Sequence, residues 1–128
     1  MRLINHTCIG TNNMEKAAEF YSSVLAPLGA TIVGTVEGHS TMFGTDEGPE
    51  LIIVNPANGE PATVSNGGTY GFKAPSRAAI DEFHANGLAL GGTDEGAPGP
   101  RAFAPNAYAA YLRDLDGNKI CAVCMEAE

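Results

Sequence analysis

Three cysteines are the residues of this 128-residue chain whose type and spacing most directly suggest chemistry. Cys121 and Cys124 form a Cys-x-x-Cys pair, a spacing found in half of a zinc knuckle and in redox-active thiol pairs. Both lie in a predicted β-strand, where side chains three residues apart point to opposite faces, so they cannot bind one ion unless the strand bulges. Cys8 stands alone, and there is no second Cys-x-x-Cys. We therefore interpret at least Cys124 as a core residue, and we expect no disulfide framework.

Other catalytic motifs are absent from the sequence. There is no G-x-S-x-G for a nucleophilic serine, no P-loop, and no G-x-G-x-x-G that opens a helix. The pattern therefore favours neither nucleophilic catalysis nor nucleotide binding.

Charge and composition exclude several classes of partner. The formal net charge is −8, which argues against binding to nucleic acid or to an anionic membrane surface. With 44% hydrophobic and 17% charged residues, the chain is typical of a globular domain. It has no apolar run of membrane-spanning length and no basic-then-apolar start, so we expect a cytoplasmic protein.

The hydrophobic pattern predicts a mixture of helices and strands. Apolar residues at helical spacing predict helices over Met14–Leu28 and from Pro75 to about Leu90, with Leu88 facing inward. Residues 93–105 are rich in Pro and Gly and predict at best a short, irregular strand. The remaining predicted strands are Leu3–Gly10, Thr31–Val36, His39–Phe43, Glu50–Val54, Thr69–Ala74, Tyr108–Leu112 and Ile120–Met125.

The order of these elements repeats with a period near half the chain. A β-α-β-β-β unit occurs twice, so we expect a single domain of two modules that bury their faces together. The first module spans about residues 1–56, a linker spans 57–68, and the second module spans about 69–128. The predicted fold class is α+β, in which two curved sheets enclose a concave pocket and the helices lie outside.

The end of the chain carries the clearest motif. Leu112–Ile120 reads LRDLDGNKI, and Asp116-Gly117 between two apolar runs is a strong hairpin signal. This stretch resembles the last hairpin of the vicinal-oxygen-chelate superfamily, R-D-P-D-G-N-x-I-E, a superfamily that includes glyoxalase I, extradiol dioxygenases and bleomycin resistance proteins. Residues 4–29 resemble the first module of that family, with Phe20-Tyr21, Val24-Leu25 and Leu28-Gly29 in register. The resemblance covers nearly the whole chain.

The resemblance also implies where a divalent metal would be held. The family's four ligand positions fall on His6, Glu50, Thr69 and Cys121, and two of them have lost the family residue: Thr69 replaces a His and Cys121 replaces a Glu. His6, Glu50 and Cys121 remain a tentative three-ligand set, with Glu50 as the only candidate catalytic base. We expect no tightly bound cofactor; if there is one, it is zinc, nickel or iron.

Alternate residues of a strand point to the same face of a sheet, so further residues are predicted to line the pocket with these ligand positions. The predicted pocket lining consists of His6, Cys8, Glu50, Ile52, Thr69, Gly71, Cys121 and Val123.

The sequence leaves three functions open. The first is a metal-free protein that binds a small molecule in the pocket, and the second is a metal-dependent lyase, isomerase or dioxygenase with an altered ligand set. The third is a non-catalytic dimeric scaffold. Because members of the resembling family commonly pair modules across two chains, we also expect a homodimer.

Overall fold

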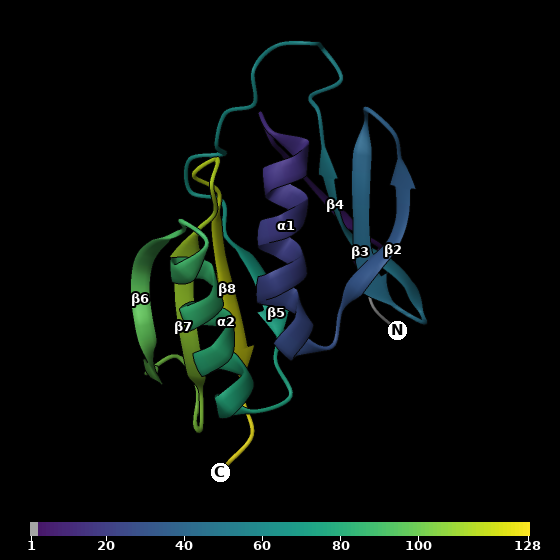
Figure 1. The fold of residues 1–128 in the computed structure, drawn as a ribbon. Helices are drawn as coiled ribbons and strands as arrows, with labels where there is room; N and C mark the ends of the chain where they lie inside the picture. Colours follow the sequence, from purple (N-terminus) through teal and green to yellow (C-terminus); the bar gives the residue numbers. More distant parts are fainter. Residues whose placement is uncertain (1–2) are drawn as a thin grey trace.

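The computed structural model describes residues 3–128 and contains two similar modules that follow each other along the chain (Figure 1). Residues 55–69 form no helix or strand and connect the modules. The first module contains β1 (Thr7–Gly10), α1 (Met14–Leu25), a 3₁₀ turn (Ala26–Leu28), β2 (Thr31–Val36), β3 (Ser40–Thr45) and β4 (Gly48–Val54). The second contains β5 (Tyr70–Lys73), α2 (Arg77–Ala89), β6 (Thr93–Pro100), β7 (Tyr108–Arg113) and β8 (Lys119–Cys124). The predicted repeat and α+β class are confirmed.

Each module forms its own four-stranded sheet with the same topology. The strand order is β1-β4-β3-β2 in the first sheet and β5-β8-β7-β6 in the second. In each sheet the first strand pairs in parallel with the last strand of its module, and Cys8 pairs with Ile52 as Gly71 pairs with Cys121. The two modules can therefore be compared position by position.

The two helices pack on one side of the sheets and on each other. The Asn86 side-chain amide donates to the Ser23 carbonyl at 3.0 Å, which joins α2 to α1. Their apolar sides meet in one core, whose largest fully buried members include Phe20, Tyr21, Phe43, Ile53, Ile80, Phe83, Leu112 and Ile120. Burial of this kind supplies the main favourable free energy of folding.

Leu88 does not face the core as predicted, and its side chain is 43% exposed. The neighbouring Gly87 is buried instead. A Cβ atom at Gly87 would lie 2.3 Å from Leu112 Cδ1, so at this point the backbone of α2 packs directly against a side chain of β7. The close approach turns Leu88 outward.

Two other predicted boundaries are corrected. The first strand begins at Thr7, not at Leu3. Thr7 pairs with Leu51, so an extension by two residues would set Asn5 opposite Pro49, which has no N–H to donate. The first helix ends at Leu25 because Pro27 follows, and Gly29, with φ of 91°, closes the 3₁₀ turn.

The predicted irregular strand near residue 93 is the eight-residue β6. It departs from regular pairing between Asp94 and Gly96 and again between Gly96 and Gly99.

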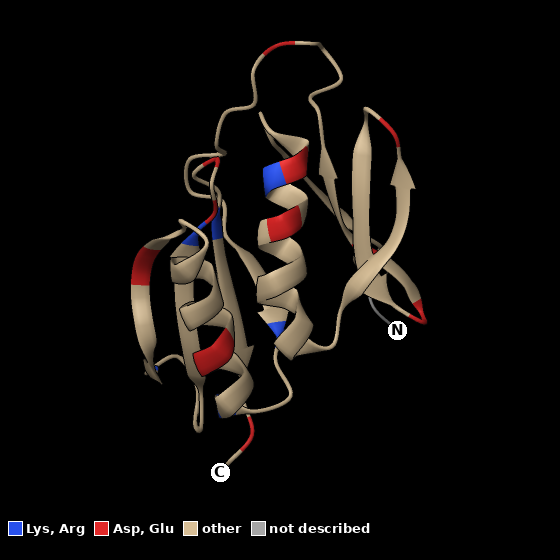
Figure 2. Ribbon diagram, in the orientation of Figure 1, with Lys and Arg blue, Asp and Glu red and all other residues tan. Residues whose placement is uncertain are grey.

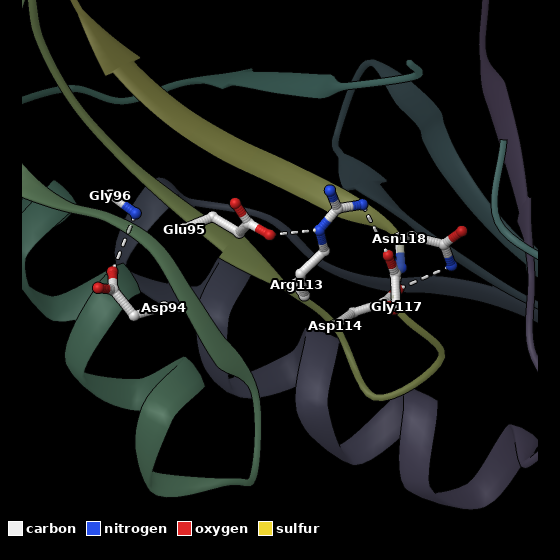
Figure 3. A network of polar contacts seen from close by, with 7 residues as sticks. All are labelled: Asp94, Glu95, Gly96, Arg113, Asp114, Gly117 and Asn118. Atoms are coloured by element: carbon white, nitrogen blue, oxygen red, sulfur yellow. Dashed lines mark hydrogen bonds and ion pairs between the residues drawn. The ribbon is translucent and has the colours of Figure 1, made fainter. Parts of the chain in front are cut away.

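The turn between β7 and β8 is organised by the buried carboxylate of Asp114 (Figure 3). Its Oδ1 atom accepts the backbone N–H groups of Asp116 and Asn118, both at 2.9 Å. Its Oδ2 atom accepts the Asn118 side-chain amide at 3.0 Å and the Tyr21 hydroxyl at 2.6 Å. Burial, followed by the Asp114 charge, raises the pKa of Tyr21 well above its ordinary value, so the phenol remains a donor.

The same turn forms hydrogen bonds with the first module. The Asp116 carboxylate accepts the Thr11 hydroxyl at 2.5 Å and the Asn12 backbone N–H at 2.9 Å. The Asn118 amide also donates to the Gly10 carbonyl at 3.2 Å. We call these contacts of Asp114, Asp116 and Asn118 the turn network; it joins the β7–β8 turn to the C-terminal end of β1 and to α1.

Arg113 lies beside the turn network. Its Nε donates to Glu95 at 2.8 Å and its Nη1 to the Gly117 carbonyl at 3.0 Å (Figure 3). Among the described residues, neither helix is long and apolar enough to cross a lipid bilayer.

We expect Tyr21→Phe to lower the free energy of unfolding by about 1–3 kcal/mol, because it removes a donor from a buried carboxylate. The matched control is Tyr108→Phe, which removes the 2.7 Å bond from Tyr108 to Asp81 at the surface and should cost less than about 0.5 kcal/mol. Urea denaturation measures both. Equal losses in the two variants would show that the buried carboxylate is not the stronger constraint.

Candidate functional site

A groove with a volume of about 830 Å³ lies between the two modules. Its walls come from the segment before β1, the start of β4, strand β5, and the region from the end of α1 to Ala30. The volume falls in the range of small-molecule sites. Four residues of the predicted pocket line it: His6, Glu50, Thr69 and Gly71.

His6 and Thr69 occupy equivalent places in the repeat. Each directly precedes the first strand of its module, β1 or β5. His6 is exposed, and its Nδ1 lies 2.8 Å from the Asn5 side-chain oxygen. Both residues line the groove, but both lie just outside the strands. Strand pairing therefore does not fix the positions of their side chains.

The other four predicted residues do not line this groove. Cys8 pairs with Ile52, and Val123 pairs with Lys73 on the neighbouring strand. Cys121 is buried, but alternation along β8 directs it away from α2, because Ile120 and Ala122 belong to the core beneath that helix. Its Sγ lies 3.4 Å from where a Cβ atom of Gly71 would stand. Burial raises the pKa of the Cys121 thiol, with a smaller opposing effect from Lys119.

The tentative metal ligands are not gathered at one point of this chain. His6 and Glu50 share the groove, but Cys121 is not among its lining residues. The strand register gives Ile52 the place in the first module that Cys121 has in the second, and it matches Glu50 with Lys119. Within residues 3–128, no three His, Cys, Asp or Glu side chains are positioned to hold a metal ion.

Sequence analysis did not single out three candidate site residues, Arg101, Tyr111 and Lys119. They lie on the side of the second sheet opposite α2. Tyr111 pairs with Cys121, and its ring is approached by Lys119 and by Arg101. The hairpin register could have placed Tyr111 and Lys119 beside Cys121. Arg101 could not have been found, because it follows the irregular strand β6 and reaches back over it.

Comparison with known proteins gives a consistent result. The family model described as the Glyoxalase/Bleomycin resistance protein/Dioxygenase superfamily matches residues 3–122. No curated protein sequence matches the chain significantly.

Among solved structures, a glyoxalase/bleomycin resistance protein from Albidiferax ferrireducens T118 is 40% identical, with a TM-score of 0.86, and the match covers 98% of this chain and 100% of that one. A lactoylglutathione lyase from Agrobacterium tumefaciens is 25% identical, with a TM-score of 0.66, and covers 97% and 94%. A family enzyme from Burkholderia phytofirmans PsJN, at 16% identity and a TM-score of 0.72 over 94% and 97%, shares the fold.

The three free cysteines should differ in reactivity. Cys8 is exposed, whereas Cys121 and Cys124 are buried. We expect iodoacetamide to label Cys8 of the native protein promptly and to label the other two only after unfolding, because burial blocks access and disfavours the thiolate. Peptide mass mapping measures the labelling, and Cys8→Ser should abolish the fast reaction. Prompt labelling of Cys121 would contradict its placement.

Proposed function

Because the chain belongs to the Glyoxalase/Bleomycin resistance protein/Dioxygenase superfamily, we propose that it binds a small organic molecule between its modules without a tightly bound metal. The observation that carries the proposal is the groove of about 830 Å³ at the junction of the modules. Its lining combines apolar side chains, among them Leu28, Phe43 and Phe72, with a few polar ones. That combination suits a ligand that is mostly apolar and is oriented by a small number of hydrogen bonds.

The residues at the family's four metal-ligand positions support binding without a metal. The resemblance places Thr69 and Cys121 where relatives carry His and Glu, and threonine is a poor ligand for zinc, nickel or iron. His6 and Glu50 alone would leave a divalent ion with too few protein ligands for a stable site. In a metal-free protein, His6 serves as a polar group at the rim of the groove. The three free thiols support a reducing, cytoplasmic environment for the protein.

Thr69→Tyr should block the groove and weaken small-molecule binding. Thr69 lines the groove, so a larger side chain there takes up ligand volume. The matched control is Thr35→Tyr, on the exposed edge strand β2 outside the groove lining. Ligand-observed NMR with a library of neutral and charged fragments measures binding. Fragments that bind wild type and the control but not Thr69→Tyr support the proposal, whereas equal binding to all three proteins contradicts this location.

Metal content separates this proposal from a metalloenzyme. We expect protein purified without a histidine tag to contain far less than one equivalent of zinc, nickel or iron by elemental analysis. One equivalent that is lost in His6→Ala would contradict the metal-free proposal and favour a metal-dependent lyase, isomerase or dioxygenase.

We also propose that the protein is a homodimer. Leu3 and Ile4 are 96% and 67% exposed in a segment that pairs with no strand, and apolar side chains of this kind are typical of a surface covered by a partner. Light scattering at micromolar concentration should give twice the chain mass of 13.2 kDa. Ile4→Glu should shift the protein toward monomer, whereas Leu88→Glu, on the exposed side of α2, should not. A monomeric wild type would contradict the proposal.

A further inference from the structure

The face of the second sheet opposite α2, which we call the helix-free face, is rich in basic residues. Alternation along the strands places Lys73, Arg113 and Lys119 on it together with Tyr111 and Cys121. Arg101 joins them, because its guanidinium lies over the Tyr111 ring. These four bases are more than half of the seven Lys and Arg residues in a chain whose net charge is −8. Figure 2 shows blue segments on β5, around the β7–β8 turn and on α1; red segments lie on both helices, on β6 and in the loops.

Within residues 3–128, three of these four cations form no ion pair, namely Lys73, Arg101 and Lys119. Arg113 is paired with Glu95. The hydrogen bond from Arg113, and then the charges of Arg113 and Lys119, lower the pKa of Glu95, so one carboxylate faces two cations here. Lys119 Nζ lies 5.4 Å and Arg101 Cζ lies 5.6 Å from the centre of the Tyr111 ring. The ring attracts both cations but does not neutralise either of them. The face therefore keeps a local positive potential in an acidic protein.

The backbone holds the Arg101 guanidinium in place. It donates to the carbonyls of Ala97, Gly99 and Pro100 at 2.8, 2.8 and 3.2 Å. A Cβ atom at Gly96 would stand 3.2 Å from Arg101 Nη2, so the absence of a side chain there leaves room for the guanidinium. Arginine has five N–H donors, and three carbonyls leave at least two of them for a ligand.

We infer that the helix-free face binds the anionic group of a small organic ligand, a carboxylate or phosphate, through Arg101 and Lys119 on either side of Tyr111. The ligand oxygens accept charge-assisted hydrogen bonds from the two cations. The apolar part of the ligand then lies along the Tyr111 ring and extends across the sheet toward Gly71, which also lines the intermodule groove. This inference rests on the proposed function, because it names the chemical class of the ligand.

Phenyl phosphate, benzoate, benzamide and inorganic phosphate are suitable probes, because benzamide is the neutral counterpart of benzoate and inorganic phosphate lacks a ring. We expect phenyl phosphate and benzoate to shift backbone amide NMR signals of β6, β7 and β8 in a saturable way. Benzamide should bind at least about tenfold more weakly than phenyl phosphate, because it has no anionic group to accept charge-assisted hydrogen bonds from the two cations. Inorganic phosphate should also bind at least about tenfold more weakly, because it has no ring to pack against Tyr111.

Three variants test the residues. Lys119→Met keeps a long apolar side chain beside Tyr111 and should weaken phenyl phosphate binding about tenfold or more. Lys119→Arg retains the charge and should preserve binding. The matched control is Lys16→Met, which removes the same charge from the exposed surface of α1 and should leave affinity unchanged. Thermal unfolding confirms that each variant is folded.

Several results would overturn the inference. Equal affinity for benzoate and benzamide, or unchanged affinity in Lys119→Met, would show that the ligand's charge is not recognised on this face. In that case the proposed function would still stand if fragments bind in the groove of wild type and Thr69→Tyr blocks them. Inorganic phosphate binding as tightly as phenyl phosphate would show a simple anion site and overturn the organic ligand. Failure of every probe on this face, together with failure of every fragment in the groove, would overturn both proposals.

Discussion

One buried carboxylate, that of Asp114, constrains much of this fold. A charged group without water is costly unless its lone pairs are satisfied, and here four donors satisfy them. Two donors come from the backbone of its own turn, so the turn must adopt one conformation. Another comes from Tyr21 on α1, so the first helix must lie where its phenol reaches that turn. Local geometry and the placement of the first helix thus depend on the same oxygen atoms.

The neighbouring residues extend this constraint from a helix to a sheet. Asp116 and Asn118 contact Thr11, Asn12 and the Gly10 carbonyl, all at the end of β1. The Arg-Asp-x-Asp-Gly-Asn pattern therefore has a structural explanation apart from ligand chemistry. Each Asp or Asn of the pattern has a defined acceptor or donor, and Gly117 adopts φ of 91°, which a residue with a side chain rarely adopts.

The fold could be predicted from sequence because its determinants are local. The helical spacing of Ala17, Tyr21 and Val24 and the hairpin motif each specify an element without reference to distant residues. The site was harder to predict, because its geometry depends on packing between modules. Glu50 stands two residues before the position that matches Cys121, a register set by pairing with Thr7 and its neighbours. Arg101 reaches Tyr111 through an irregular strand whose shifts no periodicity reveals.

The turn network and the groove lie at opposite ends of the junction between the modules. The network contacts Gly10, Thr11 and Asn12, at and just after the end of β1, whereas residues 3–7, before and at the start of β1, line the groove. The junction is thus bridged by polar contacts at one end and open at the other, while the packing of α1 on α2 also joins the modules. These contacts fix how the two modules lie relative to each other, and so they fix the distance between the walls of the groove. The width of the groove therefore depends on side chains of the turn network that do not line it.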